Sequence, residues 1–319
     1  MVVDEAHYVK NIGVGRTKAI KRWIDNAPRV LFMTGTPLEN RLEEFINLSK
    51  QLDPQFSSNL NRAALSAGIE VFRHAAAPMY LRRNTQEVLK ELPELIWKDE
   101  YCSWENSNYE MYLDAVQKGN FMGMRRAGMT PLRYGVNPNK LERILEITEE
   151  AFENKKKVII FSFFRDPLQL VLDTLKEKAL GPINGDMPSK ARQELIDQFT
   201  NDPEPKALVG QISSMGTGLN IQAASVVILC EPQIKPSLEV QAIARAHRMG
   251  QVNTVQVHRL VIPDSVDNLM LKLLAEKQST FDAYARESAL ADAVKGAKDL
   301  SEEELARTLV MKERKRLSR

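Results

Sequence analysis

The stretch Lys157-Val-Ile-Ile-Phe161 is an apolar run of strand length, and a segment of helical period, Pro167 to Leu180, follows it. The pattern repeats with a short strand and turn at Pro182-Ile-Asn-Gly-Asp186 and a helix from Ser189 to Phe199, where serine is a residue type that caps helices. A further helix is predicted before this stretch and further strands after it: Leu141 to Phe152, Lys206 to Gly210, Val226 to Cys230 and Val255 to Leu260. Strands separated by single helices predict an α/β fold with a parallel sheet and right-handed crossovers.

A second pattern of this kind lies at the start of the chain. Met1-Val-Val precedes Asp4-Glu-Ala-His7, and the apolar run Arg29-Val-Leu-Phe-Met33 ends in the turn Thr34-Gly-Thr-Pro37. Ligands of parallel sheets bind at the carboxyl ends of the strands. Polar groups follow strands at several such ends: Asp4, Thr34, Ser162, the loop 213–220 and Glu231. The sequence therefore predicts binding sites at the carboxyl edges of its sheets.

Asp4 and Glu5 are the carboxylates best suited to chemistry. A hard cation such as Mg²⁺ takes carboxylate oxygens, and a general base must lie beside the water that it activates. In a nucleotide hydrolase Asp4 would bind the ion and Glu5 would activate the water. The alternative is that these residues are only the charged turn at the end of a strand. The hydroxyls of Thr34 and Thr36 could cap the following helix, Leu38 to Leu52, or could couple a nucleotide site to a strand of nucleic acid.

The stretch Gln241-Ala-Ile-Ala-Arg-Ala-His-Arg-Met-Gly-Gln251 places Gln241, Arg245 and Arg248 at positions i, i+4 and i+7. If the stretch is helical, these three side chains share one face. Two guanidinium groups on one face are suited to gripping phosphate. The alternative is a solvated basic helix, to which spacing alone gives about half the weight.

The middle of the chain is predicted to be helical over residues 53–95, with a short strand from Leu95 to Tyr101 and a helix near Tyr109 to Gln117. The Gly-, Met- and Arg-rich stretch from Lys118 to Asn139 is predicted to be a linker with solvated arginines, namely Arg125, Arg126 and Arg133.

Two more helices are predicted after the last strand, at Ser265 to Ala285 and from Ser301-Glu-Glu-Glu304, which has a capping-box pattern. The cations between Lys312 and Arg319 suit the carboxyl end of a helix dipole. We expect a solvated terminus there, and a DNA contact has about one chance in four.

The composition excludes several classes of protein. The chain has 319 residues, 43% of them hydrophobic, enough for two packed domains, and its 44 Lys and Arg balance 42 Asp and Glu, so any basic surface must be local. Its two cysteines, Cys102 and Cys230, and the lack of zinc spacings predict a reducing compartment without a disulfide framework. The start lacks a signal-peptide pattern, and the longest apolar runs are too short to cross a membrane. We expect a soluble cytoplasmic protein associated with DNA, or a nuclear one in a eukaryote, with no membrane partner.

These motifs, in this order, resemble the SWI/SNF-like family of superfamily-two, helicase-like DNA translocases with a DEAH box. Asp4-Glu-Ala-His7 with Lys10-Asn11 resembles motif II of that family, and Leu31 to Asn40 resembles motif III. The other matching segments are Leu81-Arg-Arg83, Glu87 to Pro93, Lys157 to Phe163 (motif IV), Ile183 to Asp186 with Arg192-Gln193, Gly216 to Ala224 (motif V) and Gln241 to Gln251 (motif VI). The resemblance covers residues 1 to about 275.

The resemblance implies two RecA-like lobes with parallel sheets and flanking helices, with ATP and magnesium in the cleft between them. It divides the chain into a partial first lobe with a helical insertion (1–98), a linker (99–139), a complete second lobe (140–275) and a carboxy-terminal helical extension (276–319). By family the protein would be an ATP-dependent, helicase-like hydrolase. It would move along duplex DNA by contacts with the DNA backbone, without true strand separation.

The resemblance also assigns roles to single residues. Glu5 would be the catalytic base, and Arg245 and Arg248 would be arginine fingers that stabilise charge in phosphoryl transfer. Asp4 would hold magnesium. The residues assigned to the nucleotide are Asp4, His7, Gly218, Asn220 and Gln241, and those assigned to nucleic acid are Thr34, Thr36, Ser162, Ser214 and Thr217, with Asn220 a candidate for both.

Three departures from the family pattern are visible. The family's Asp-Pro-Trp-Trp-Asn-Pro is Glu231-Pro-Gln-Ile-Lys-Pro236 here, and the usual glycine pair of motif V is Gly216-Thr-Gly218. The third is that none of the fifteen glycines precedes a lysine, so the phosphate-cradling loop G-x-x-x-x-G-K-[ST] is absent.

We therefore expect the carboxy-terminal part of a motor, which needs an upstream lobe segment or complex subunits as partners and hydrolyses ATP poorly or not at all by itself. One alternative is a non-hydrolysing nucleic-acid- or partner-binding remnant. Another is the motor part of a restriction or phage-defence complex.

Overall fold

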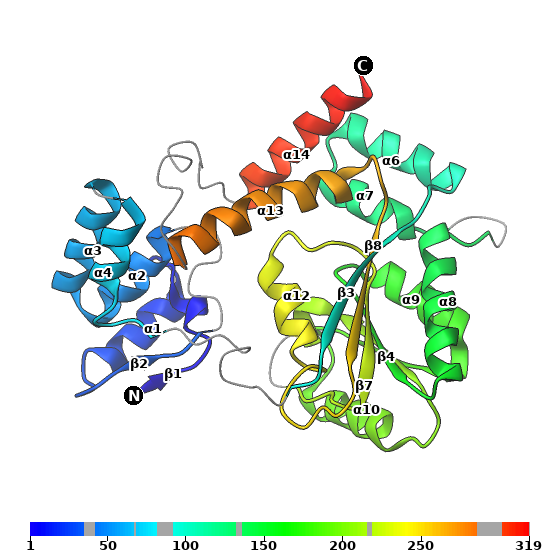
Figure 1. Cartoon of the computed structure of the whole chain (residues 1–319), viewed down its shortest axis with the longest axis horizontal. Helices are drawn as coiled ribbons and strands as arrows, with labels where there is room; N and C mark the ends of the chain where they lie inside the picture. The colour runs from blue at the N-terminus through cyan, green and yellow to red at the C-terminus, as the bar shows by residue number, and fades with distance from the viewer. Residues whose placement is uncertain are drawn as a thin grey trace. The chain divides into compact units, whose positions relative to one another are not determined.

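The chain forms two compact units (Figure 1). The computed structural model describes residues 1–34, 42–66, 68–81, 92–131, 136–215, 219–285 and 302–318. Unit 1 comprises Met1–Asn84 and Leu274–Glu304, and unit 2 comprises Thr85–Leu273 and Leu305–Arg319. Among the described residues, no helix is long and apolar enough to cross a membrane.

Unit 2 is built around a six-stranded sheet in which every neighbouring pair of strands is parallel. The strands are β3 (Leu95–Tyr101), β4 (Lys157–Ser162), β5 (Ala179–Ile183), β6 (Ala207–Gln211), β7 (Ala224–Leu229) and β8 (Val255–Val261). Their order across the sheet is β3-β8-β7-β4-β6-β5. The parallel α/β sheet predicted from the sequence is confirmed.

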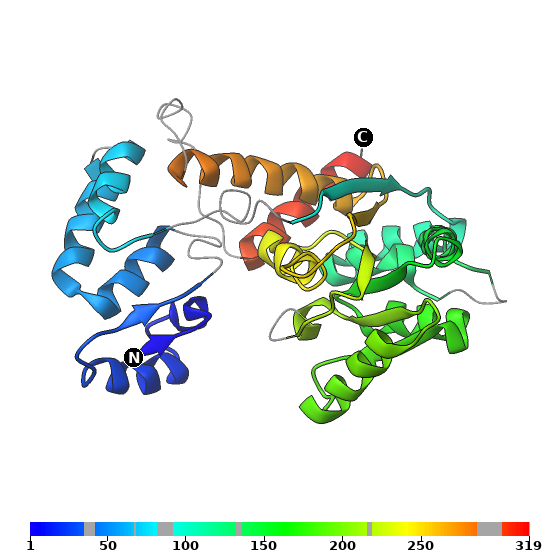
Figure 2. The same cartoon turned by 60° about the horizontal axis from the view of Figure 1, so that its bottom comes forward.

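Helices cover both faces of this sheet (Figures 1 and 2). Successive side chains of a strand point to opposite faces. In β4, Val158 and Ile160 therefore pack with residues of α8 (Asn139–Glu153) and α9 (Arg165–Leu175). Ile159 and Phe161 pack on the other face, where the helices are α10 (Ser189–Asn201), α11 (Ile212–Met215) and α12 (Pro236–Ile243). All four β4 side chains are fully buried, and burying each contributes about 1.5–3 kcal/mol relative to exposure.

One helix is shorter than its sequence predicted. α9 ends at Leu175, a 3₁₀ turn, η4 (Lys176–Lys178), follows, and β5 begins at Ala179, whereas the helical pattern ran on to Leu180. Leu180 instead lies opposite Leu208 of β6. Pairing with β6 gives these backbone groups their hydrogen-bond partners, so the strand begins earlier than the helical pattern indicates.

Residues 99–139, predicted to be a linker, are largely packed into unit 2. The segment begins in β3, which runs in register with β8 from Leu95 opposite Val255 to Tyr101 opposite Val261. It continues through α6 (Asn106–Lys118), α7 (Phe121–Arg126) and the 3₁₀ turn η2 (Ala127–Met129). Several of its side chains are buried: Tyr112, Ala115, Val116, Phe121, Met124, Ala127 and Met129. The glycine and methionine content of residues 118–139 indicated a linker, but the buried apolar side chains of the segment pack into the core.

The carboxy-terminal helix α14 (Glu302–Leu317) is bonded to α6 and to the turn before α13 (Val266–Ala285). Arg314 donates from Nε to the carbonyl oxygen of Val116 (2.9 Å) and from Nη2 to that of Gln117 (2.6 Å). These carbonyls lie in the last turn of α6, where a helix has too few N–H donors of its own for its carbonyl oxygens. That of Val116 also accepts from the N–H of Gly119. Arg316 donates to the carbonyl oxygen of Asp264. Two of the terminal cations predicted to be solvated are therefore structural.

Unit 1 holds a two-stranded parallel sheet, β1 (Val2–Val3) with β2 (Leu31–Phe32). One face packs on a small cluster of buried side chains, Val3, Ala6, Val9 and Leu48. The helical elements of the unit are η1 (Ala6–Val9), α1 (Gly15–Ile24), α2 (Leu42–Leu52), α3 (Pro54–Ser66) and α4 (Gly68–Ala76).

Candidate functional site

The turn after β1 holds Glu5 in a left-handed backbone conformation, with φ 49° and ψ 46°. This conformation costs a residue with a side chain roughly 1–2 kcal/mol. Asp4 is exposed, and its Oδ1 accepts a hydrogen bond of 2.8 Å from the backbone N–H of Glu5. The N–H of Ala6 donates to the carbonyl oxygen of Met33, which ties the turn to the end of β2. The predicted catalytic base is thus the strained residue of a turn fixed between two strand ends.

His7 and Thr34 lie beside Glu5. His7 is buried, and its Nδ1 lies 3.1 Å from Oε2 of Glu5 and 3.4 Å from Oγ1 of Thr34. Three residues predicted from the DEAH-like stretch and from the following strand end therefore meet at one place in unit 1.

The oxygens of this turn fit a magnesium ion that is bound mainly by phosphate and water. The turn offers the exposed carboxylate of Asp4 and the carboxylate of Glu5, whose buried Oε2 makes no hydrogen bond of good geometry in the described structure. No cluster of three or more His, Cys, Asp or Glu side chains with metal-site geometry occurs among the described residues. One or two carboxylates are what magnesium takes from a protein at a phosphate site.

The segment with Arg245 and Arg248 is not a continuous helix. α12 ends at Ile243, and residues 244–250 form successive turns. The condition for a shared helical face with Gln241 is therefore not met. Arg245 is half-buried, with Nη1 3.5 Å from the carbonyl oxygen of Leu219, whereas Arg248 is exposed.

Gln251 fixes these turns from inside unit 2. Its side-chain Nε2 lies within hydrogen-bond distance of three carbonyl oxygens, those of Gln222 (3.0 Å), Ala224 (2.9 Å) and Ala246 (3.1 Å). The backbone N–H of Ile221 donates to the carbonyl oxygen of Arg245. Motif VI is thereby joined to the last residues of motif V. Gln251 belongs to the motif, but no role was predicted for it, because most of its partners lie in another segment of the chain.

The residues predicted to contact nucleic acid fall into three groups. Ser162 is fully buried, and its hydroxyl donates to Oε2 of Glu231 (2.8 Å), so its side chain does not reach a ligand in this structure. Ser214 is half-buried and Asn220 is exposed, both in the region of motif V. Thr36 and Thr217 lie outside the described residues, as does Gly218, which was predicted to contact the nucleotide. Of the remaining site residues, Asp4, Glu5, His7 and Thr34 belong to unit 1, and Gln241, Arg245 and Arg248 to unit 2.

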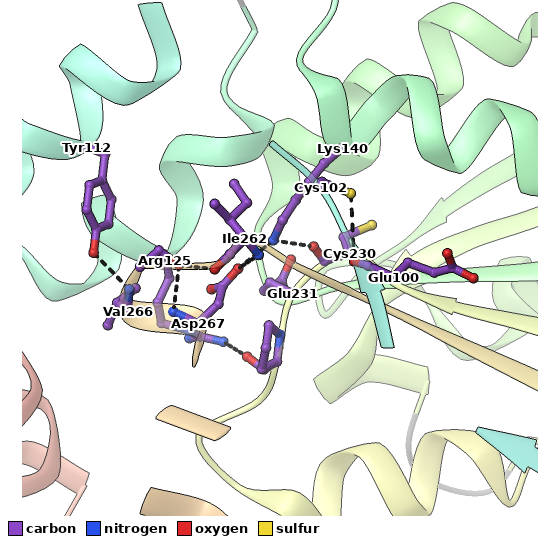
Figure 3. A network of polar contacts seen from close by, with 12 residues as sticks. Glu100, Cys102, Tyr112, Arg125, Lys140, Cys230, Glu231, Ile262, Val266 and Asp267 are labelled. Carbon is purple, nitrogen blue, oxygen red and sulfur yellow. Dashed lines mark hydrogen bonds and ion pairs between the residues drawn. The ribbon is translucent and has the colours of Figure 1, made fainter. Parts of the chain in front are cut away.

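A buried polar network surrounds the carboxyl end of β7 (Figure 3). Glu231 is 2% exposed and accepts hydrogen bonds from Ser162, from the N–H of Phe163 (2.7 Å) and from Gln233 (2.9 Å). Burial raises the pKa of its carboxyl group, and the positive charge of Arg125 and these hydrogen bonds oppose the rise. A second buried pair lies nearby, with Lys140 donating to Asp267 (2.7 Å) and to the carbonyl oxygen of Cys230 (3.1 Å).

Arg125 is the largest departure from the sequence analysis within this network. It was predicted to be solvated, yet it is 3% exposed. No local pattern indicates this burial apart from the phenylalanines at 121, 163 and 164, whose rings surround its guanidinium group.

Two family profiles match this chain. The SNF2-related domain matches residues 1–147, and the helicase conserved C-terminal domain matches residues 139–250. The chain belongs to the SNF2-related, helicase-like proteins.

Named relatives agree with this family. An uncharacterized ATP-dependent helicase of Mycoplasma pneumoniae is 31% identical over 307 residues, which cover 87% of this chain and 30% of the relative. The ATP-dependent helicase fft1 of Schizosaccharomyces pombe is 26% identical, over 86% of this chain and 39% of the relative. The chain thus spans about a third of the length of these relatives.

Solved structures show the same fold. The C-terminal part of the Fun30 ATPase domain matches 72% of this chain and 99% of its own length, with a TM-score of 0.57 and 18% identity. The Sulfolobus solfataricus SWI2/SNF2 ATPase core in complex with dsDNA matches 96% of this chain and 71% of its own, with a TM-score of 0.50 and 24% identity. The mostly parallel sheet with flanking helices is therefore that of SNF2 ATPase cores.

Proposed function

We propose that this chain supplies part of the ATPase machinery of a DNA-dependent, double-stranded DNA translocase. One observation carries the proposal: the residue at the predicted base position, Glu5, is held in a strained left-handed turn beside Asp4, His7 and Thr34. Strain of this kind persists where the surrounding structure fixes it, and it clusters at active sites. The matches to the helicase family models support the same function. Arg245 and Arg248, the predicted arginine fingers, support it as well.

ATP is the proposed substrate, and magnesium the proposed ion. Asp4 would hold the ion, which when bound would neutralise charge on the phosphates. Glu5 would accept a proton from the attacking water. Arg245 and Arg248 would donate to phosphate oxygens as negative charge develops on them. Gln241, Asn220 and His7 would help to position the nucleotide.

Duplex DNA is the proposed partner, held mostly through its phosphates. Among the described residues, Ser214, Asn220 and Thr34 remain the candidates for these contacts, because the side chain of Ser162 is buried. The Sulfolobus neighbour was solved in complex with dsDNA, which supports a duplex. Hydroxyl and amide groups that contact the backbone position the protein without reading sequence.

We further propose that residues 1–319 alone bind nucleotide weakly and hydrolyse ATP poorly, since no glycine in the chain is followed by lysine. A P-loop lysine contacts the β- and γ-phosphates, and the glycines let the backbone approach them. An upstream lobe segment or complex subunits would supply these groups. Among the described residues, no particular contact favours membership of a restriction or phage-defence complex.

Two measurements on purified 1–319 test the proposal. The first is binding of the ATP analogue adenylyl imidodiphosphate with magnesium, where we expect Arg245→Ala to weaken binding about tenfold or more. Arg307→Ala, at an exposed position on α14, should leave binding unchanged. Equal affinities for Arg245→Ala and wild type would count against the arginine role.

The second measurement is ATP turnover with and without duplex DNA. A turnover of order one per second that Glu5→Gln abolishes would overturn the proposed inactivity of the isolated chain and would strengthen the ATPase assignment. DNA binding without any nucleotide binding would instead favour a non-hydrolysing nucleic-acid-binding protein.

A further inference from the structure

Arg125 occupies a site that a charged side chain rarely fills. It is 3% exposed, and its guanidinium carbon lies 5.9 Å from the ring centre of Phe121 and 5.3 Å from those of Phe163 and Phe164. Its Nε makes no hydrogen bond in the described part of the structure. A buried, incompletely bonded charge is costly, and apolar side chains of similar volume often replace such groups without loss of stability. The position of Arg125 therefore calls for a role beyond holding the fold together.

Two of the polar groups that Arg125 contacts belong to the segment after β7, and a third, the sulfur of Met122 in the same helix, lies 3.8 Å from its Nη1. Its Nη2 donates to the carbonyl oxygen of Pro232 (2.9 Å) and lies 3.5 Å from Oε1 of Gln233. The other end of the Gln233 amide donates to the backbone and side-chain oxygens of Glu231, both at 2.9 Å. Arg125 thus orients the Gln233 amide between itself and Glu231.

From Gln233 the contacts continue into α12. The backbone N–H of Gln233 donates to Oε1 of Glu239 (2.7 Å), in the first turn of α12. Oε2 of Glu239 accepts from Arg259 (3.1 Å), and Arg259 pairs with Asp99 on β3 through two bonds of 2.8 and 3.2 Å. A continuous chain of polar contacts therefore runs from α7 to the start of the helix that leads into Arg245.

We propose that Arg125 is a positioning residue: by fixing Pro232 and Gln233 it sets the placement of α12 and, through α12, of Arg245. Where the resembled family has two tryptophans, this chain has Gln233 and Ile234, and Gln233 with Arg125 holds the segment instead. The part of this inference that concerns nucleotide rests on the proposed function, and the part that concerns α12 does not.

Hydrogen exchange of the intact chain tests the placement of α12. Arg125→Met keeps much of the volume and removes the donors, and Arg126→Met is its matched control, because the adjacent Arg126 is exposed and pairs only with exposed Asp166 among its described contacts. We expect Arg125→Met to speed exchange at Gln233 and at residues 240–246 by about tenfold or more, and Arg126→Met to leave those amides unchanged. Arg125→Lys, which keeps the charge and one donor, should restore part of the protection.

A matching variant covers the case in which Arg125→Met does not fold. Gln233→Leu removes the same link from the other side and should speed exchange at residues 240–246 in the same way. Unchanged exchange there in both Gln233→Leu and Arg125→Lys would overturn the inference.

Nucleotide binding separates positioning from a purely structural role. With adenylyl imidodiphosphate and magnesium, we expect Arg125→Lys to weaken binding several-fold in the wild-type background and to have no further effect in an Arg245→Ala background, since both changes remove the same contact. Independent, additive losses would overturn positioning through Arg245. If the wild-type chain binds no nucleotide, the proposed function fails, and the exchange measurement still decides whether Arg125 places α12.

Discussion

At the scale of single residues, the backbone conformation of Glu5 serves the proposed function at a cost in stability. Its φ of 49° suits glycine or asparagine better than glutamate. We expect Glu5→Asn to keep or raise the stability of unit 1 by up to about 1 kcal/mol, and Glu5→Val to lower it by about 1–2 kcal/mol, because a β-branched side chain is the least tolerated there. Urea unfolding of the two variants checks this, and equal midpoints would contradict the strained turn.

The buried pair Lys140 and Asp267 leads to a second expectation at this scale. Their side chains are 1% and 5% exposed, and they meet at 2.7 Å. Asp267→Asn would leave the lysine charge buried without its counter-charge, at a cost of about 3–5 kcal/mol. The double variant Lys140→Met/Asp267→Leu should cost clearly less, since no charge remains to be buried. Denaturant unfolding of the two proteins decides this, and a double variant as unstable as Asp267→Asn would refute it.

Single residues also show where sequence reasoning ends. Asp4, Glu5, His7 and Thr34 could be singled out because a short motif and a strand end place them in known positions. The burial of Arg125 could not, since it depends on phenylalanines and carbonyl groups that the fold brings from Phe163, Phe164 and Pro232. A local pattern of glycine, methionine and arginine contains no information on such distant neighbours.

At the scale of elements, the side chain of Glu100 connects β3 to α8 and β8. Arg143 of α8 donates to its Oε2 (3.1 and 3.0 Å), and His258 of β8 and Lys98 contact its Oε1 at 2.8 and 2.9 Å. Burial raises the pKa of Glu100, but the hydrogen bonds from these three residues outweigh burial and lower it to about 2.

A pH dependence follows from the lowered pKa of Glu100. Because the pKa is depressed in the folded state, its stabilisation is complete above the ordinary value of 4.5 and is lost as the pH falls toward about 2. We expect a contribution of up to roughly 3 kcal/mol. Urea unfolding between these pH values checks this, with Glu100→Gln showing a flatter dependence than wild type. Parallel curves for the two proteins would rule out Glu100 as the source.

The ends of elements were harder to predict than their existence. The strands β4, β6 and β7 appear as apolar runs in the sequence because they are buried on both faces, whereas β8 alternates buried valines with the half-buried Gln256 and His258. The end of α12 at Ile243 has no such local signal, since the groups that hold the following turns come from Leu219 to Ala224 and from Gln251. Gln241, Arg245 and Arg248 therefore have helical spacing in the sequence, but in the structure they do not lie on one continuous helix.

At the scale of the whole molecule, the two units differ in the size of their cores. Unit 1 has two small clusters of buried side chains, whereas two large clusters cover the faces of the unit 2 sheet. The unit 1 clusters are Val3, Ala6, Val9 and Leu48 at the β1–β2 sheet and Phe45, Leu60, Phe72 and Ala76 among its helices. A two-stranded sheet is marginal by itself. We expect two unfolding transitions, with unit 1 unfolding at the lower denaturant concentration.

Matched valine substitutions assign these transitions. Val3→Ala in β1 should shift only the first transition, and Val158→Ala in β4 only the second, each by about 2 kcal/mol for the buried groups removed. The measurement is urea unfolding monitored by hydrogen exchange in each unit. A single transition that moves equally in both variants would show that the units unfold together.

The pairing of β3 with β8 has a consequence for how the protein is made. Leu95 lies opposite Val255, so the ribosome must complete the intervening residues before the strand at the edge of the sheet meets its neighbour. Until then the backbone N–H and C=O groups of β3 lack their partners on β8, and an unpaired strand invites association with other unfolded chains. Contacts between segments so far apart form slowly, because the entropy of closing the loop is lost before any pairing energy is gained. The last strand of the sheet to be synthesised is thus the one that pairs with the first.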